Sequence, residues 1–298
     1  MATIRSYNPE EIICPVDMSE ISDLALKYAH VGARIFDASL TILHSVHFDY
    51  PRYLSDELTA RVLEEMDSAK TAIRNEVEDH VRRVLGDINQ EVRVRYQVTD
   101  TEPAEAVMQA LAENKADLVV MGTHGYSGIK RWMLGSVTEN ILYRSQVPVF
   151  TVRQKINDFI DTNRPEARPR IQNILCPCNL TKAAGHALQT AAALASRFGA
   201  RLTAMRSIES DIAADNLDFT AWIEKSIGSS DNIDTVVRRG AAAARTIDLA
   251  KELNCDLIVI GAHHRQFEQG TVVGRTTELV LRHAPVPVLA VPSRHDAL

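Results

Sequence analysis

The sequence predicts an α/β protein made of two tandem copies of one domain, each with a five-stranded, mostly parallel, doubly wound sheet. Three observations predict this fold. Short β-branched runs alternate with helical patterns, which is typical of βαβ units. The pattern of the first half recurs in the second half. The length of 298 residues suits two domains, and 45% hydrophobic residues are enough for each half to bury a core.

The first copy begins with a predicted strand over residues 12–17, a short apolar run that ends in the carboxylate of Asp17. Ser19 is a suitable N-cap for a helix from Glu20 to Phe36, whose apolar residues follow helical spacing. A short turn then leads to a second strand over residues 40–46.

A long, charged helix is predicted next, over residues 55–85, because its apolar residues form one stripe and Gly86 follows it. Residues 92–98 alternate like a strand. Pro103 suits the first turn of a helix, and we expect that helix to continue through Glu113.

A glycine-bearing loop joins the next strand, residues 117–121, to a helical pattern that ends near Arg144. Gly122 and Gly125 remove side chains at the strand exit, so backbone N–H groups can approach a ligand. Gly135 and Ser136 open the helix, whose first amides are unpaired and carry the positive end of the helix dipole. The hydroxyls of Ser136 and Thr138 add donors, so we expect a phosphate here.

A last strand, residues 147–152, completes the first copy. Right-handed crossovers place helices on both faces of such a sheet, and ligands bind beyond the carboxyl ends of its strands, where the strand order reverses. Asp17 and Gly122 both follow strand ends. The sequence therefore predicts that both reach one crevice.

The repeat is visible residue by residue. Ile174–Asn179 repeats Ile12–Asp17 at one constant offset, and from Asp256 to Pro287 a second constant offset repeats Asp117 to Pro148. The difference between the two offsets is an insertion in the first half, which mostly lengthens the charged helix. We predict domains over residues 1–153 and 171–298, joined by a polar linker over 154–170 that contains two prolines.

The spacing Gly122-x2-Gly125-x9-Gly135-Ser136 resembles the ATP-binding signature G-x2-G-x9-G-[ST] of the universal stress protein family. Neither a G-x-x-x-x-G-K-[ST] loop nor a strand followed by G-x-G-x-x-G occurs. The order of elements and the Val-Asp ending of the first strand extend the resemblance over nearly the whole chain, twice, as in a tandem member. It implies a Rossmann-like, adenine nucleotide alpha hydrolase-like sheet that binds ATP, with Mg²⁺ bridging the phosphates.

The resemblance also implies a set of site residues. Pro15, Val16 and Asp17 would contact the adenosine portion, and Val46 or its neighbour would line the adenine slot. Asp17 has a second interpretation, in which its charge complements a helix dipole. The ribose and phosphates would be held by residues at the strand exit and the helix start, namely Met121, Gly122, Thr123, His124, Gly125, Gly135, Ser136, Val137 and Thr138.

Three side chains near the loop have open roles. His124 can face the phosphates or solvent. Lys130 and Arg131 can be a solvated pair or can assist phosphate binding electrostatically.

The second copy departs from the signature at three positions. Asn179, His264 and Arg275 stand where the first copy has Asp17, Gly125 and Ser136. A histidine in place of a glycine is a steric obstacle, and an arginine at a helix N-terminus opposes the dipole unless an anion lies beside it. We therefore expect the second copy to bind no ATP, or to hold another anionic ligand.

No metal site is predicted from the cysteines or histidines. The four cysteines, at positions 14, 176, 178 and 255, read as core thiols of a reducing compartment. Cys176-Pro-Cys178 lacks a second pair of ligands, and the adjacent His263 and His264 lack a third.

Composition excludes several functions. The net charge is −6 without a basic patch, which argues against nucleic-acid binding. No signal peptide and no apolar run of about 20 residues is present, so we expect a cytoplasmic protein without a membrane span. Neither a G-x-S-x-G elbow, a catalytic cysteine nor a carboxylate pair is legible, so no catalytic residue is predicted.

The expected function is that of an ATP-binding stress-response or signalling protein, in which the nucleotide acts as a conformational or partner switch. Two alternatives remain: a slow ATP hydrolase and a nucleotide-independent dimeric scaffold. The resemblance implies pairing of the last strands. Because an unpaired apolar edge is a liability, we predict that residues 147–152 and 287–291 pair within one chain as a pseudo-dimer, with a further homodimer possible.

Overall fold

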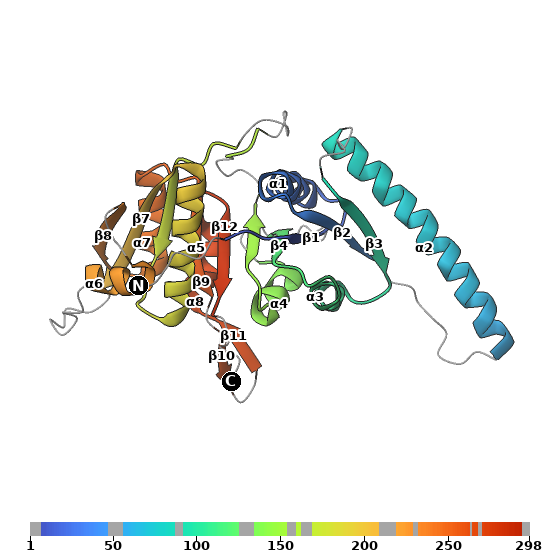
Figure 1. Ribbon diagram of the computed structural model, residues 1–298. Coiled ribbons are helices and arrows are strands. Elements are labelled where there is room, and N and C mark those ends of the chain that lie inside the picture. Colours follow the sequence, from blue (N-terminus) through green and yellow to red (C-terminus); the bar gives the residue numbers. More distant parts are fainter. Residues whose placement is uncertain are drawn as a thin grey trace.

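In the computed structural model the chain forms one continuous ten-stranded sheet with helices on both faces (Figure 1). The structure describes residues 7–46, 56–86, 92–124, 134–153, 159–161, 169–208, 219–228, 232–262, 264–267 and 270–293; for 56–63, 264–267 and 270–273 it describes the backbone only.

The first half contains all the strands and helices predicted for it, with bounds that differ by at most two residues. In chain order these are β1 (Glu11–Pro15), α1 (Glu20–Phe36), β2 (Ser39–Ser45), α2 (Asp56–Leu85), β3 (Val94–Thr99), α3 (Pro103–Asn114), β4 (Leu118–Gly122), α4 (Ser136–Arg144) and β5 (Val149–Val152).

The second half repeats this order, and it also contains a hairpin whose first-half counterpart lies outside the described residues. Its elements are β6 (Asn173–Pro177), α5 (Lys182–Phe198), β7 (Arg201–Ile208), α6 (Phe219–Ile227), β8 (Ile233–Arg239), α7 (Ala242–Glu252), β9 (Leu257–Ala262), β10 (His264–Phe267), β11 (Gly270–Val273), α8 (Arg275–His283) and β12 (Val288–Pro292). The predicted insertion is confirmed, because α2 has 30 residues where α6 has 9.

The strand order explains how the halves join. It is β3-β2-β1-β4-β5-β12-β9-β6-β7-β8, parallel within each half and antiparallel only between β5 and β12. Phe150 pairs with Leu289 across this junction, and the Thr151 hydroxyl donates to the Val288 carbonyl at 3.2 Å. The predicted pairing of the two last strands is thus confirmed, and it merges two five-stranded sheets into one.

Two helical layers cover the sheet. One core lies under α1, α2, α5 and α6 and the other under α3, α4, α7 and α8, and both continue across the two halves. All four cysteines are buried and free, as predicted for core thiols. Within the part of the chain that the structure describes, no helix is long and apolar enough to cross a membrane.

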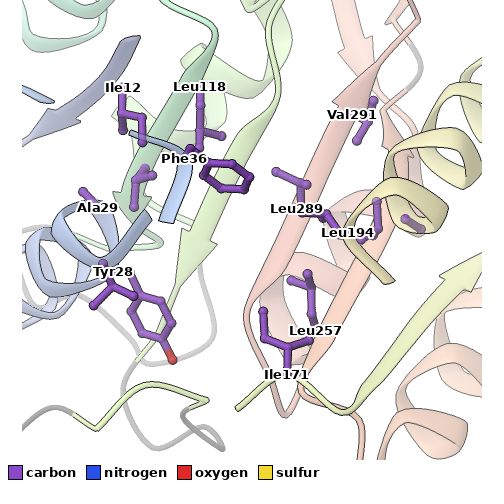
Figure 2. Close-up of a cluster of buried hydrophobic side chains, with 14 of the residues drawn as sticks. Ile12, Tyr28, Ala29, Phe36, Leu118, Ile171, Leu194, Leu257, Leu289 and Val291 are labelled. Atoms are coloured by element: carbon purple, nitrogen blue, oxygen red, sulfur yellow. The ribbon is translucent and has the colours of Figure 1, made fainter. Parts of the chain in front are cut away.

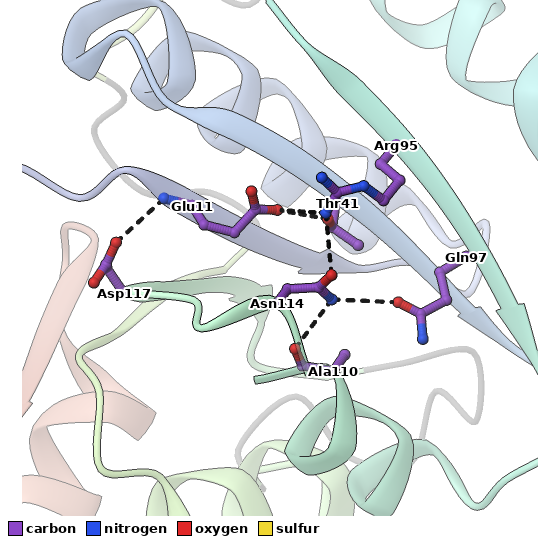
Figure 3. A network of polar contacts seen from close by, with 7 residues as sticks. All are labelled: Glu11, Thr41, Arg95, Gln97, Ala110, Asn114 and Asp117. Carbon is purple, nitrogen blue, oxygen red and sulfur yellow. Dashed lines mark hydrogen bonds and ion pairs between the residues drawn. The ribbon is translucent and has the colours of Figure 1, made fainter. Parts of the chain in front are cut away.

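The amino ends of the strands carry polar contacts in each half, and Figure 3 shows those of the first half. The Asp117 carboxylate accepts hydrogen bonds from the amides of Glu10 and Glu11, and the Asp256 carboxylate accepts from the amides of Gln172 and Asn173. In the first half, Thr41 also donates to Glu11 at 2.6 Å. These bonds fix the entry of each first strand at the edge opposite the predicted crevice.

Candidate functional site

A cleft of about 260 Å³ lies at the carboxyl ends of β1, β2 and β4, where the strand order of the first half reverses. Of the predicted site residues that the structure describes, all but Val46 and Thr123 line it. The lining consists of Pro15, Val16, Asp17, Ser22, Leu43, Ser45, Pro103, Val107, Met121, Gly122, His124, Gly135, Ser136, Val137 and Thr138.

One side of the cleft is apolar. Val16, Leu43, Val107 and Met121 are buried side chains that line it, and Pro15 ends β1 beside them. A flat apolar slot of this kind suits an aromatic base.

Of the predicted contribution of Val46 or its neighbour, it is the neighbour Ser45 that lines the cleft. Val46 does not line the cleft, and its amide donates to the Thr99 carbonyl at 2.8 Å. Leu43 and Ser45 line the cleft instead, because alternate residues of a strand share a face. Strand alternation together with the pairing of β1 with β2 was the signal that could have identified them.

The other side of the cleft is the amino end of α4. Gly135 is the N-cap of this helix and provides no side-chain cap, so the amides of residues 136–138 depend on another acceptor. The Ser136 side chain is exposed at the same point. The arrangement offers donors and the positive end of a helix dipole to an anion.

Three donors that the sequence suggested for phosphate binding are already used by the protein. The Thr123 amide donates to the Val152 carbonyl at 2.9 Å, and the Gly135 amide donates to the Thr123 carbonyl at 2.8 Å. The hydroxyl of Thr138 donates to the Gly122 carbonyl at 2.9 Å. The Thr123 bond extends the pairing of β4 with β5, and the other two bonds join the end of β4 to the start of α4, so these three donors already have partners within the protein.

Packing against α1 gives a reason for glycine at position 122 besides the predicted access of the backbone to a ligand. A Cβ at this position would overlap the Ile21 side chain of α1, and a Cβ at the corresponding Gly261 would lie 2.8 Å from the Ala183 carbonyl carbon of α5. These glycines let a helix approach the end of a strand.

Asp17 forms a turn that the second half repeats without a charge. Its Oδ1 accepts from the Ser19 amide at 3.1 Å and from the Ser19 hydroxyl at 2.6 Å. Asn179 Oδ1 accepts from the Thr181 hydroxyl at 2.6 Å in the same way. The turn therefore needs only an oxygen, and the negative charge in the cleft is particular to the first half.

His124 lies in the cleft wall, next to Thr123, whose hydroxyl is 2.9 Å from His124 Nδ1. Of its two predicted positions, the structure favours the one that faces the cleft. Gly125, Lys130 and Arg131, and the side chains of His263 and His264, lie outside the described residues.

The described part of the chain offers neither a metal cluster nor an activated thiol. No group of three or more His, Cys, Asp or Glu side chains in it is placed to hold a metal ion. The two closest thiols, Cys176 and Cys178, have sulfur atoms 3.8 Å apart. Burial raises the pKa of Cys14 and raises that of Cys255 to about 12, so both stay protonated at neutral pH.

The second-half counterpart of the glycine loop is an unexpected hairpin. Residues 264–267 pair with residues 270–273 in an antiparallel two-stranded sheet, and β11 lies against α4 of the first half. Thr271, Val272 and Val273 are β-branched and follow Gly270, a local pattern that could have predicted the hairpin. Aligning the second half to the first half gave no indication of this hairpin.

Comparisons with known proteins agree with the duplicated fold. The model of the universal stress protein family matches residues 9–153 and again 170–292. A universal stress protein of Mycolicibacterium smegmatis is 25% identical over 310 residues, covering 98% of this chain and 100% of that protein. One from Methanocaldococcus jannaschii is 24% identical over 157 residues, which is 49% of this chain and 96% of that protein.

A solved structure has the same architecture. The crystal structure of a universal stress protein from Archaeoglobus fulgidus superposes with a TM-score of 0.68 at 22% sequence identity, covering 95% of this chain and 98% of that one. This similarity concerns the fold.

Proposed function

Because this chain belongs to the universal stress protein family as a tandem two-domain member, we propose that its first half binds ATP in the cleft beyond β1, β2 and β4. The first half would correspond to residues 1–153 and the second to residues 171–298, with the linker between them. The nucleotide would act as a switch in a stress or signalling response rather than as a substrate.

One observation carries this proposal: a single cleft joins an apolar slot to the uncapped amino end of a helix. The slot, lined by Val16, Leu43 and Met121, would take the adenine, and the amides of residues 136–138 would take phosphate oxygens. Asp17 lines the same cleft, and its carboxylate would accept hydrogen bonds from ribose hydroxyls.

A divalent cation would bridge the phosphates and neutralise part of their charge. Mg²⁺ bound to a nucleotide usually keeps several waters and needs few protein ligands. The chain would contribute by orienting the phosphates on α4.

The second half supports the assignment by contrast. Arg275 begins α8 where Ser136 begins α4, and Asn179 removes the carboxylate. The hairpin of β10 and β11 follows β9 directly. We propose that this half binds no ATP.

A switch requires that ATP binding changes something beyond the cleft. The amino end of α4 is where the phosphates would bind, and the same helix lies against β11 of the other half. A ligand that prefers one arrangement of α4 would therefore shift the population of arrangements at this contact between the halves.

The test is calorimetric titration of the full chain with ATP and Mg²⁺, using a matched pair of variants. Ser136→Glu places a negative charge at the first position of α4, which favours the helix dipole but repels phosphates. We expect ATP to bind the wild-type chain one to one and Ser136→Glu at least about tenfold more weakly. Arg275→Glu, the same change at the start of α8, should leave the affinity unchanged.

Three results would contradict the proposal: no ATP binding by the wild-type chain, no effect of Ser136→Glu, or an equal loss in Arg275→Glu. Phosphate release measured in the same samples separates a switch from a slow hydrolase. A rate in the wild-type chain equal to that of Ser136→Glu supports the switch.

A further inference from the structure

A second cavity lies at the junction of the two halves, away from the ATP cleft. Its walls come from α1, β4 and β5 of the first half and from α5, β9 and β12 of the second, with Phe159 and Ile171 of the connecting segment beside them. It encloses about 60 Å³ and is partly open to solvent. Figure 2 shows the side chains gathered there, among them Phe36, Leu118, Leu194 and Leu289.

The walls are apolar apart from two tyrosine hydroxyls. Phe36, Phe150, Phe159 and Phe198 supply aromatic surface, and aliphatic residues supply the rest. Such walls favour apolar molecules over water, because a bound water needs two to four polar partners.

Tyr7 lines this cavity and carries an orphaned polar group. Its hydroxyl is fully enclosed and makes no hydrogen bond to any residue that the structure describes. Burial, and then the Asp117 carboxylate, raise the pKa of Tyr7, so the hydroxyl keeps its proton and remains a donor. A buried donor without an acceptor is costly, and an acceptor on a bound molecule would remove that cost.

Gly32 keeps the cavity open from the α1 side. It lies in the interior of α1, where glycine is less stable than alanine. A Cβ there would meet only Ile12 Cδ1, at an ordinary 3.6 Å, so packing within the protein does not demand glycine. The corresponding residue of α5 is Leu194. A leucine at position 32 would occupy the space that the cavity leaves.

The charges nearby select for a neutral molecule. The Asp117 carboxylate lies near enough to Tyr7 to act on it, which disfavours an anion. At the rim the Arg197 guanidinium lies 4.7 Å from the centre of the Phe36 ring and donates to the Ile35 carbonyl, which disfavours a cation. The apolar walls would solvate neither.

We propose that this cavity is a binding site for a small uncharged apolar molecule, or the apolar end of a larger one, that accepts a hydrogen bond from the Tyr7 hydroxyl. The volume is below the roughly 150 Å³ of a cavity that holds benzene, so the bound part has the size of a short alkyl chain. A molecule bound here contacts both halves and strengthens their junction. The site is independent of ATP.

The experiment is a titration of the full-length chain with 1-butanol, followed by the methyl NMR signals of Leu118, Leu194 and Leu289. Sodium butyrate, which has a chain of the same length but a negative charge, is the comparison ligand. We expect saturable shifts with 1-butanol and none with butyrate. Shifts that do not saturate, or equal binding of butyrate, would overturn the proposal.

Variants locate the site. Gly32→Leu should abolish the saturable shifts, and Tyr7→Phe should weaken binding about fivefold. Gly185→Ala removes an interior glycine of α5 whose Cβ would come no closer than 3.8 Å to any atom, and it should bind like the wild-type chain. If Gly32→Leu does not fold, Gly32→Ala, which fills part of the space, is expected to weaken binding about threefold. Wild-type binding in the glycine-32 variants would refute the assignment.

Discussion

The two halves repeat one scaffold, and their clefts show which residues serve the fold and which are left for a ligand. Thr138 and Thr277 donate to the carbonyls of Gly122 and Gly261 at 2.9 and 3.0 Å, respectively. A hydrogen bond that both halves make cannot explain why one half would bind ATP and the other would not. The internal repeat therefore acts as a control for each site residue.

What differs between the halves at the corresponding strand ends is mostly charge. Asp17 and Ser136 of the first half are replaced by Asn179 and Arg275. Around the same edge of the sheet, Lys182 stands in the position of Glu20 and Arg239 in that of Asp100. At these four positions the second half is the more basic one.

The largest expected change in stability concerns Gly122 and Gly261, the glycines that the two halves share. Gly261→Ala should destabilise the protein by about 3 kcal/mol, because the new methyl meets the α5 backbone, which cannot turn aside. Gly122→Ala should cost about 1 kcal/mol, because the Ile21 side chain can change rotamer. Urea unfolding measures both.

The control for that pair is Gly185→Ala, which fills open space in a helix and should stabilise by about 0.5–1 kcal/mol. If Gly261→Ala proves as stable as this control, the glycine is not required by packing, and the comparison with Gly122 fails.

The next-largest expected change in stability concerns Thr138 and Thr277. Thr138→Val and Thr277→Val each leave a carbonyl without its side-chain donor, so each should cost about 1–2 kcal/mol. Neither should weaken ATP binding by removing a phosphate contact. Calorimetry measures the ATP affinity, and urea unfolding measures the stability. If the Thr138 hydroxyl bound phosphate instead, Thr138→Val would lose ATP affinity without losing stability.

The smallest effect concerns pH. Burial, together with the 2.7 Å hydrogen bond to Glu139, raises the pKa of Tyr143 to about 12, whereas Arg282 at the corresponding position pairs with Glu278. An unfolded tyrosine titrates near pH 10, so the folded state binds the proton more tightly. This contribution is complete below about pH 10 and is lost as the pH rises to about 12.

Tyr143→Phe removes that dependence. The stability difference between the variant and the wild-type chain, from urea unfolding at about pH 9 and about pH 11.5, should shrink at the higher pH. A difference that grows with pH would show that the hydroxyl does not favour the folded state in its neutral form.

Periodicity and the repeat predicted the elements and the pairing of β5 with β12, because those features depend on local spacing and on covering an apolar edge. The cleft was located by the rule for parallel sheets. The occupied donors of Thr123, Gly135 and Thr138 were not predictable, since a sequence does not show which hydrogen bonds the scaffold uses. The cavity beside Tyr7 was missed for a similar reason: its walls come from both halves.

The central claim is that one half of the chain, and only the first, binds ATP. Native mass spectrometry of the full chain with ATP and Mg²⁺ tests it directly, because it counts nucleotides per chain. The account predicts one ATP on the wild-type chain and on Arg275→Glu, and a much smaller fraction of ATP-bound chains for Ser136→Glu at an ATP concentration near the wild-type Kd. Two nucleotides per chain, or one that Ser136→Glu retains and Arg275→Glu loses, would contradict it.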